Sequence, residues 1–259
     1  QPAMEGGLGL DGMFGDAGDD DEGVTEVTRQ VSQRVGPEAS AAPGATSSER
    51  LRVAEFGAEE FWHGRWDGEG DAHEWFTVDA RALWPVLQPL AAQLGLARPI
   101  EGGEPPRIVE LGCGLSRLSL DLALHHGLQG IVATDLVPRC VEVGRAAAAK
   151  EGLGPPVLSF QVEDALATSF ADGSFALVLD KGCADVFALS DDATALPKYA
   201  REVVRLTAAG GFCVLVTAWT AERRRERLRL FAGLAHVSTT MVHSHGPAAE
   251  HMVVLRREG

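Results

Sequence analysis

Short apolar runs that alternate with helix-like segments fill most of the chain from Ile108 onward. Five runs rich in Val, Ile, Leu and Phe predict buried strands: Ile108–Leu111, Ile131–Thr134, Val157–Gln161, Phe175–Leu179 and Phe212–Thr217. Helical spacing of apolar positions lies between most of them: Ser116–His126, Pro138–Glu151 and Pro197–Leu206. Because strands of this kind are apolar on both faces, the alternation predicts a parallel sheet covered by helices on both sides.

Two more strand-like runs follow a predicted helix, Ala221–Ala235, near the end of the chain: His236–Val242 and Glu250–Glu258. The seven residues between them are too few for a right-handed crossover, so we expect an antiparallel hairpin at one edge of the sheet. The predicted fold class is therefore α/β, a doubly wound, Rossmann-like, seven-stranded and mostly parallel sheet with a C-terminal antiparallel hairpin. Upstream, Ala80–Leu96 has helical spacing that we expect to break at Pro85 and Pro89.

Composition divides the chain into two parts. Residues 1–50 are rich in Gly, Ala, Ser and Asp, and they hold ten acidic residues against three arginines, half of the net charge of −14. Because this segment has little to bury and its acids repel one another, we predict a disordered acidic tail over 1–50 and a folded domain over 51–259.

The overall charge and the cysteines narrow the function classes. A net charge of −14 argues against general nucleic-acid binding, which needs a basic surface, and is compatible with a basic protein partner. The four cysteines form no CxxC pair and indicate free thiols in a reducing compartment. No apolar run reaches membrane-spanning length, so we expect no membrane association and a cytoplasmic location; a mitochondrial one stays open because the chain begins at Gln1. The sequence leaves the oligomeric state open.

The first predicted strand ends in a tight glycine pair, Gly-Cys-Gly, from which a helix begins. Gly112 permits a sharp turn, and Gly114 lets a ligand approach the main chain where a Cβ would intrude. The helix start points free N–H groups at the bound group. Asp135 ends the next predicted strand, 21 residues after Gly114, where a carboxylate can accept both hydroxyls of a ribose. Together these features indicate a site for an adenosine-containing ligand.

The choice among adenosine ligands follows from what the turn lacks. A dinucleotide site needs a third glycine at the position that Arg117 occupies, and no GK[ST] phosphate loop follows the turn. The remaining common ligand is S-adenosyl-L-methionine, which has no phosphate to bind.

Several motifs resemble one enzyme family. VELGCG resembles motif I of the class I methyltransferases, with Glu110 at its acidic position; GCGLSRLS, LDKGCADVF, EFGAEEFWHGRW and EWF are similar to elements of one subgroup. That subgroup contains the elongation factor 1-alpha lysine methyltransferases and the citrate synthase lysine methyltransferase, and the resemblance runs from about Glu55 to Arg257. The chain departs from the subgroup pattern at Leu115, Trp66, Ala176 and Cys183, and we expect the last two near the pocket.

The resemblance implies further cofactor contacts. ATDLV resembles the ribose motif, which places Leu136 beside Asp135, and VEDALATSF puts Asp164 and Ala165 beside the adenine. The resemblance also implies that three aromatic side chains close over the cofactor: Trp62, Trp66 and Trp75. Aromatic faces attract a sulfonium cation and stack on adenine, which gives this arrangement a physical basis.

Two residues after the fourth predicted strand complete the expected site. Lys181 is a candidate charge partner for the cofactor's carboxylate, and Asp180 is a candidate for orienting an incoming amine. We predict no metal, because no Cys or acid set completes a site around the histidine pairs. The predicted function is methyl transfer from S-adenosyl-L-methionine to an amine of a protein, a lysine side chain. Methylation of a small metabolite and a non-catalytic adaptor with the same fold remain alternatives.

Overall fold

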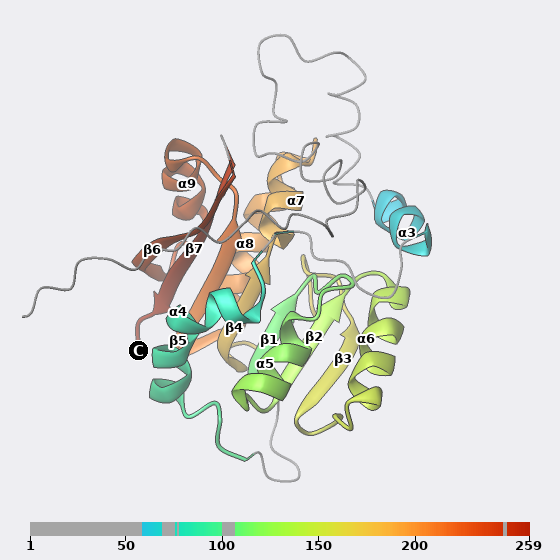
Figure 1. Cartoon of the computed structure of the whole chain (residues 1–259). Helices are drawn as coiled ribbons and strands as arrows, with labels where there is room; N and C mark the ends of the chain where they lie inside the picture. Colours follow the sequence, from blue (N-terminus) through green and yellow to red (C-terminus); the bar gives the residue numbers. More distant parts are fainter. Residues whose placement is uncertain (1–58, 69–75, 77, 100–106, 246–247) are drawn as a thin grey trace, which may run out of the picture. The chain divides into compact units, whose positions relative to one another are not determined.

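A computed structural model describes residues 59–68, 76, 78–99, 107–245 and 248–259 (Figure 1). Seven strands form one sheet in the order β3-β2-β1-β4-β5-β7-β6. Their bounds are β1 Ile108–Leu111, β2 Ile131–Asp135, β3 Leu158–Val162, β4 Phe175–Lys181, β5 Thr207–Thr217, β6 Leu234–His245 and β7 Ala248–Arg257. The first five pair in parallel, while β7 pairs antiparallel with both β5 and β6. This confirms the predicted fold class and the terminal hairpin. Within the hairpin, β7 lies between β5 and β6, so that β6 forms the edge of the sheet.

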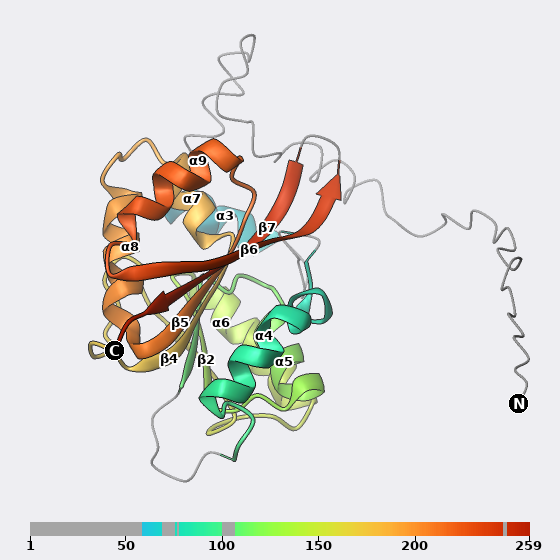
Figure 2. The same ribbon diagram turned by 90° about the vertical axis from the view of Figure 1, so that its left-hand side faces the viewer.

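Helices cover both faces of the sheet, as the apolar strands require (Figure 2). Their bounds are α3 Glu59–Gly68, α4 Ala80–Leu94, α5 Leu118–His126, α6 Pro138–Lys150, α7 Cys183–Leu189, α8 Ala195–Leu206 and α9 Ala221–Arg227, which continues into the short 3-10 helix Leu228–Leu230. Alternate strand residues enter two separate cores: Ile108 packs in the core under α4, α5 and α6, whereas Val109 packs in the core under α7 and α8. The strands are therefore buried on both sides.

Three helices differ from the expectation. Helix α4 does not break: Pro85 and Pro89 lie inside it on its exposed side, one turn apart, while Leu83 and Leu87 pack the opposite side into the core. Water can bond the carbonyls that the two prolines leave without a donor, and packing of the apolar side outweighs their helix-breaking cost. Helix α9 is shorter than expected because it tightens into the 3-10 turn at Leu228, and α7 was not anticipated.

The described residues contain no helix that combines the length and the apolar character needed to cross a bilayer. The predicted tail over 1–50 and the start of the domain at 51 lie outside the described residues.

Candidate functional site

Strand order reverses at β1, whose two neighbours in the sheet are β2 and β4. Ligands of open α/β sheets bind at such a point, beyond the carboxyl ends of the strands. A cavity of about 310 Å³ lies there, within the ~300–1,000 Å³ typical of small-molecule sites. Among the described residues it is lined by the turn after β1, the end of β2, the loop after β3, the end of β4, and helices α3 and α7.

The turn after β1 brings main chain to the cavity wall. Gly112 and Gly114 both line the cavity and adopt the left-handed conformation, with φ of 66° and 53°. A Cβ on Gly112 would lie 2.8 Å from the Sγ of Cys183, so the turn fits closely against the start of α7. Helix α5 begins at Leu118, two residues later than expected, and the Oγ of Ser116 accepts the N–H of Leu118 at 3.1 Å. This bond gives the first N–H of the helix an acceptor, and the glycine turn that precedes it lies on the cavity wall.

The carboxylate of Asp135 lies at the end of β2, is 8% exposed and faces the same cavity. Its Oδ2 accepts the N–H of Gly114 at 2.8 Å and its Oδ1 accepts the N–H of Val137 at 2.9 Å. Burial raises the pKa of this carboxyl, while the two N–H donors lower it. The Cys140 thiol also bonds this carboxylate, so of its about four acceptor positions one stays for a further donor. The geometry fits a ribose diol, with Leu136 also on the cavity wall.

Two of the three predicted tryptophans lie on the part of the cavity wall that faces the glycine turn. Trp62 and Trp66 of α3 line the cavity and stack with ring centroids 5.7 Å apart and an interplanar angle of 27°. Trp66 is buried against Leu115, Val137 and Cys140, and its Cζ2 lies 3.4 Å from a Cβ built on Gly114. An aromatic wall thus faces the glycine turn. Trp75 lies outside the described residues.

The loop between β3 and β4 closes another side of the cavity. Asp164 and Ala165 line it, together with Glu163 and Leu166, which the sequence analysis did not single out. The Oδ1 of Asp164 accepts the N–H of Leu166 at 2.8 Å, a bond that sets the local turn. The second oxygen of Asp164 is the one suited to accept from an exocyclic amine.

The end of β4 contributes a lysine, as expected. Lys181 is 6% exposed and lines the cavity with Gly182 and Cys183. Glu110, at the acidic position of the turn motif, is 1% exposed and accepts a hydrogen bond from the hydroxyl of Ser119. Among the residues that the structure describes, one cationic and four anionic side chains line the cavity, a composition that fits a cofactor with both positive and negative groups and a net positive charge.

Asp180 does not lie where the sequence analysis placed it. It is 1% exposed, does not line the cavity, and its Oδ1 accepts the N–H of Cys183 at 2.8 Å. Its Oδ2 accepts the N–H of Ala184 at 2.9 Å and the hydroxyl of Tyr199 at 2.6 Å. Burial raises the pKa of Asp180 to about 6, against these donors. The carboxylate secures the start of α7, and this geometry gives no support to a contact with the acceptor.

Ala176 also differs from its expected place. It lies at the start of β4 and packs against the core under α4–α6, away from the cavity, which lies beyond the other end of the strand. Of the two subgroup departures expected near the pocket, only Cys183 lines it. Burial raises the pKa of the Cys183 and Cys113 thiols, so both stay protonated and unsuited to nucleophilic chemistry. All four cysteines are free thiols, as expected.

Asp185 is a buried acid that the sequence analysis did not single out, although it lies in the quoted LDKGCADVF stretch. Its Oδ1 accepts the N–H of Ala218 at 3.2 Å, and its Oδ2 is buried without a hydrogen-bond partner. Burial raises its pKa to about 8, with a smaller contribution from Asp180. It links α7 to the end of β5 and does not line the cavity.

Comparison with known proteins finds similarity to methyltransferases. Residues 108–211 match the family described as methyltransferase domain. Over 164 residues the chain is 30% identical to the eEF1A lysine and N-terminal methyltransferase of Danio rerio, covering 63% of this chain and 21% of that protein. Over 189 residues it is 31% identical to the chloroplastic tocopherol O-methyltransferase of Arabidopsis thaliana, covering 68% of this chain and 52% of that protein. The chain thus spans only part of each relative.

The fold has solved counterparts. The crystal structure of a SAM-dependent methyltransferase from Methanosarcina mazei aligns with a TM-score of 0.53 and 16% identity, covering 70% of this chain and 99% of that one. At this identity the likeness concerns the fold. The family match covers β1 to the first part of β5, the elements that carry the glycine turn, Asp135 and the β3–β4 loop.

Proposed function

We propose that the chain, which resembles the eEF1A lysine methyltransferases, is a class I S-adenosylmethionine-dependent methyltransferase and that it methylates a protein amine, a lysine side chain. The cavity that supports this proposal combines Asp135, the glycine turn and the stacked tryptophans around one space. When bound, S-adenosylmethionine supplies a methyl group activated by a sulfonium centre.

The residues of the cavity divide the work of holding such a cofactor. Asp135 is placed to accept the ribose hydroxyls, and Asp164 with Ala165 to contact the adenine. Lys181 offers a cation for the carboxylate of the cofactor, and the faces of Trp62 and Trp66 offer electron density to its sulfonium. With the cofactor bound, these residues would exclude water and fix its orientation, which is the main contribution expected for this reaction.

The acceptor must reach the cavity as a neutral amine, since an ammonium group has no lone pair for attack. A strong ion pair with a carboxylate would raise the pKa of the amine and slow the reaction. Both oxygens of Asp180 are already engaged with α7 and Tyr199, so no strong ion pair arises from that residue. We infer that desolvation and alignment favour the neutral amine here. A basic protein partner is the substrate we expect for a chain of net charge −14.

A small-molecule acceptor is the second candidate. The tocopherol O-methyltransferase of Arabidopsis thaliana is about as similar to this chain as the zebrafish lysine methyltransferase. Cys183 also departs from the subgroup pattern at the cavity wall. A smaller or more apolar acceptor would suit such a change.

One labelling experiment separates the candidates. The purified chain is incubated with a cell lysate and S-adenosylmethionine carrying a labelled methyl group, and protein and small-molecule fractions are analysed by mass spectrometry. We expect the label on lysine Nζ atoms of one or few proteins. At a cofactor concentration below the Kd, Asp135→Ala should lower this labelling at least tenfold, and Asp121→Asn, on the outer side of α5, should retain it. Label confined to small molecules would favour the second candidate, and binding without transfer would favour an adaptor.

A further inference from the structure

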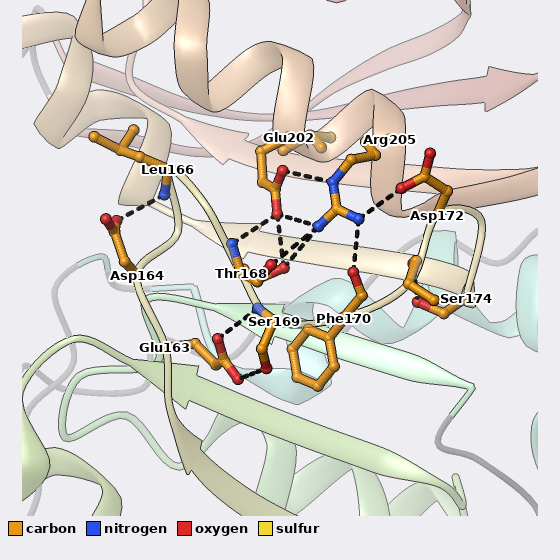
Figure 3. Close-up of polar contacts among 12 residues, drawn as sticks. Glu163, Asp164, Leu166, Thr168, Ser169, Phe170, Asp172, Ser174, Glu202 and Arg205 are labelled. Carbon is orange, nitrogen blue, oxygen red and sulfur yellow. Dashed lines mark hydrogen bonds and ion pairs between the residues drawn. The ribbon is translucent and has the colours of Figure 1, made fainter.

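A charged pair on α8 is joined by hydrogen bonds to the loop between β3 and β4 (Figure 3), and neither member of the pair lines the cavity. Glu202 is 7% exposed, and its Oε1 accepts both the N–H of Thr168 at 2.8 Å and the hydroxyl of Thr168 at 2.6 Å. The guanidinium of Arg205 holds the same carboxylate from its other side, at 2.6 Å to Oε1 and 2.8 Å to Oε2.

Arg205 extends this connection along the loop. Its Nη1 donates to the carbonyl of Phe170 at 2.6 Å and to the Oδ1 of Asp172 at 2.8 Å, and its Nη2 donates to the carbonyl of Thr168 at 3.2 Å. Its own carbonyl accepts the N–H of Gly173 at 2.7 Å. The loop is thus fixed at several successive positions by one guanidinium, which only the fork geometry of arginine allows.

The same loop lines the cofactor cavity at its other end. Asp164, Ala165 and Leu166 face the cavity, and Thr168 follows Leu166 by two residues. The Glu163 carboxylate accepts the N–H of Ser169 at 2.8 Å, which folds the cavity-lining part back onto the part held by α8. A change in the position of Thr168 therefore reaches Asp164 through a short, internally bonded stretch of chain.

We propose that Glu202 and Arg205, which do not line the cavity, are positioning residues that hold the β3–β4 loop in the shape that binds the adenine of the cofactor. This inference rests on the cofactor site and extends the proposed function. Burying a carboxylate is costly unless it is paired. Here the buried pair of Glu202 and Arg205 makes its remaining side-chain hydrogen bonds to one loop, the loop between β3 and β4. Burial raises the pKa of Glu202, but the hydrogen bonds from Arg205 and Thr168 outweigh it and lower the pKa overall, so the carboxylate stays ionised at neutral pH.

The proposal predicts a loss of affinity without a loss of chemistry. If the loop of a variant holds the binding shape for only about a tenth of the time, the apparent affinity for the cofactor falls about tenfold. Turnover at saturating cofactor should stay within about twofold, because binding restores the loop. A purely structural role would lower the stability of the protein and leave affinity unchanged.

The test uses S-adenosylhomocysteine binding by calorimetry, together with amide hydrogen exchange over residues 163–174. Arg205→Lys keeps the charge but cannot bond Glu202, Phe170 and Asp172 at once. Arg257→Lys is the matched control, because Arg257 donates only to main-chain carbonyls beside the same helix end, those of Val204 at 3.0 Å, Arg205 at 3.4 Å and Thr207 at 2.6 Å, in the bonds that the structure describes. We expect about tenfold weaker binding and faster exchange in the loop for Arg205→Lys only.

Equal affinity of Arg205→Lys and wild type would overturn the proposal, as would equal losses in Arg205→Lys and Arg257→Lys. Thr168→Val carries the test if Arg205→Lys does not unfold cooperatively: it removes one hydroxyl bond to Glu202 and should weaken binding about threefold. Because the readout is binding, it is independent of the acceptor. Wild type that binds but transfers no methyl group would refute the proposed function and leave this inference standing.

Discussion

Replacing Gly112 by alanine tests the turn that shapes the cavity. Its φ of 66° costs an L-residue about 1–2 kcal/mol. The new Cβ would also lie 2.8 Å from the Sγ and 3.0 Å from the Cβ of Cys183, and such overpacking costs about 1–3 kcal/mol. The free energy of unfolding should therefore fall by about 2–5 kcal/mol, a large share of the ~5–15 kcal/mol of an ordinary domain.

Gly114→Ala is the matched control for the first of these costs. Its φ is 53°, but its Cβ would meet only the ring of Trp66 at 3.4 Å. Urea denaturation of the unliganded proteins should show Gly112→Ala to be less stable than Gly114→Ala by about 1–3 kcal/mol. Cys183→Ala in the Gly112→Ala background should recover part of that difference. If the two glycine variants are equally stable, or Cys183→Ala gives no relief, the close fit of the turn against α7 is refuted.

Three acids give further predictions. Asp135→Ala should weaken S-adenosylmethionine binding about ten- to a hundredfold, or ~1.5–3 kcal/mol by calorimetry, because buried hydroxyls lose a charged acceptor. Asp180→Ala should lower the free energy of unfolding by ~2–5 kcal/mol in urea, against ~1 kcal/mol for Tyr199→Phe, because it leaves three donors without an acceptor. The pKa of Asp185 is raised on folding to about 8, so the folded state binds the extra proton and stability falls as pH rises between about 4 and 8. Asp185→Asn should remove the contribution of this residue, at most about 1.4 kcal/mol per pH unit in denaturation across pH 5 to 7, and leave the contribution of Asp180, whose pKa is raised to about 6. An unchanged slope between pH 6 and 7 would contradict the buried carboxyl.

The fold could be predicted from the sequence because its strands are apolar on both faces. Four of the five parallel strands appear within two residues of their expected bounds, whereas β5 begins five residues earlier, at Thr207 instead of Phe212. The short hairpin connection predicted the antiparallel edge. Helix α4 was harder to predict, because local proline chemistry opposed a helix that tertiary packing of Leu83 and Leu87 maintains. The hydrophobic pattern also could not predict the order of the last two strands in the sheet, since either strand could pair with β5.

Some features of the candidate site could likewise be predicted from the sequence, and others could not. The glycine turn and Asp135 were predicted from spacing. Neighbouring parallel strands end at the same edge of the sheet, so the turn after β1 and the residue that ends β2 must lie close together. The prediction for Asp180 was wrong because its place at the end of β4 does not reveal where its side chain points. The helix that follows, α7, was not anticipated, and its first N–H groups bind the carboxylate. The connection from Arg205 to the β3–β4 loop spans more than 30 residues of sequence, and no local pattern reveals such a contact.

Calorimetric titration of the wild-type chain with S-adenosylmethionine tests most directly whether the cavity beyond β1 is a cofactor site. The account predicts saturable binding of one cofactor per chain, weakened at least tenfold in Asp135→Ala and unchanged in Asp121→Asn. A folded wild-type chain that gives no binding heat at any temperature tested, or one whose binding is unaffected by Asp135→Ala, would contradict it.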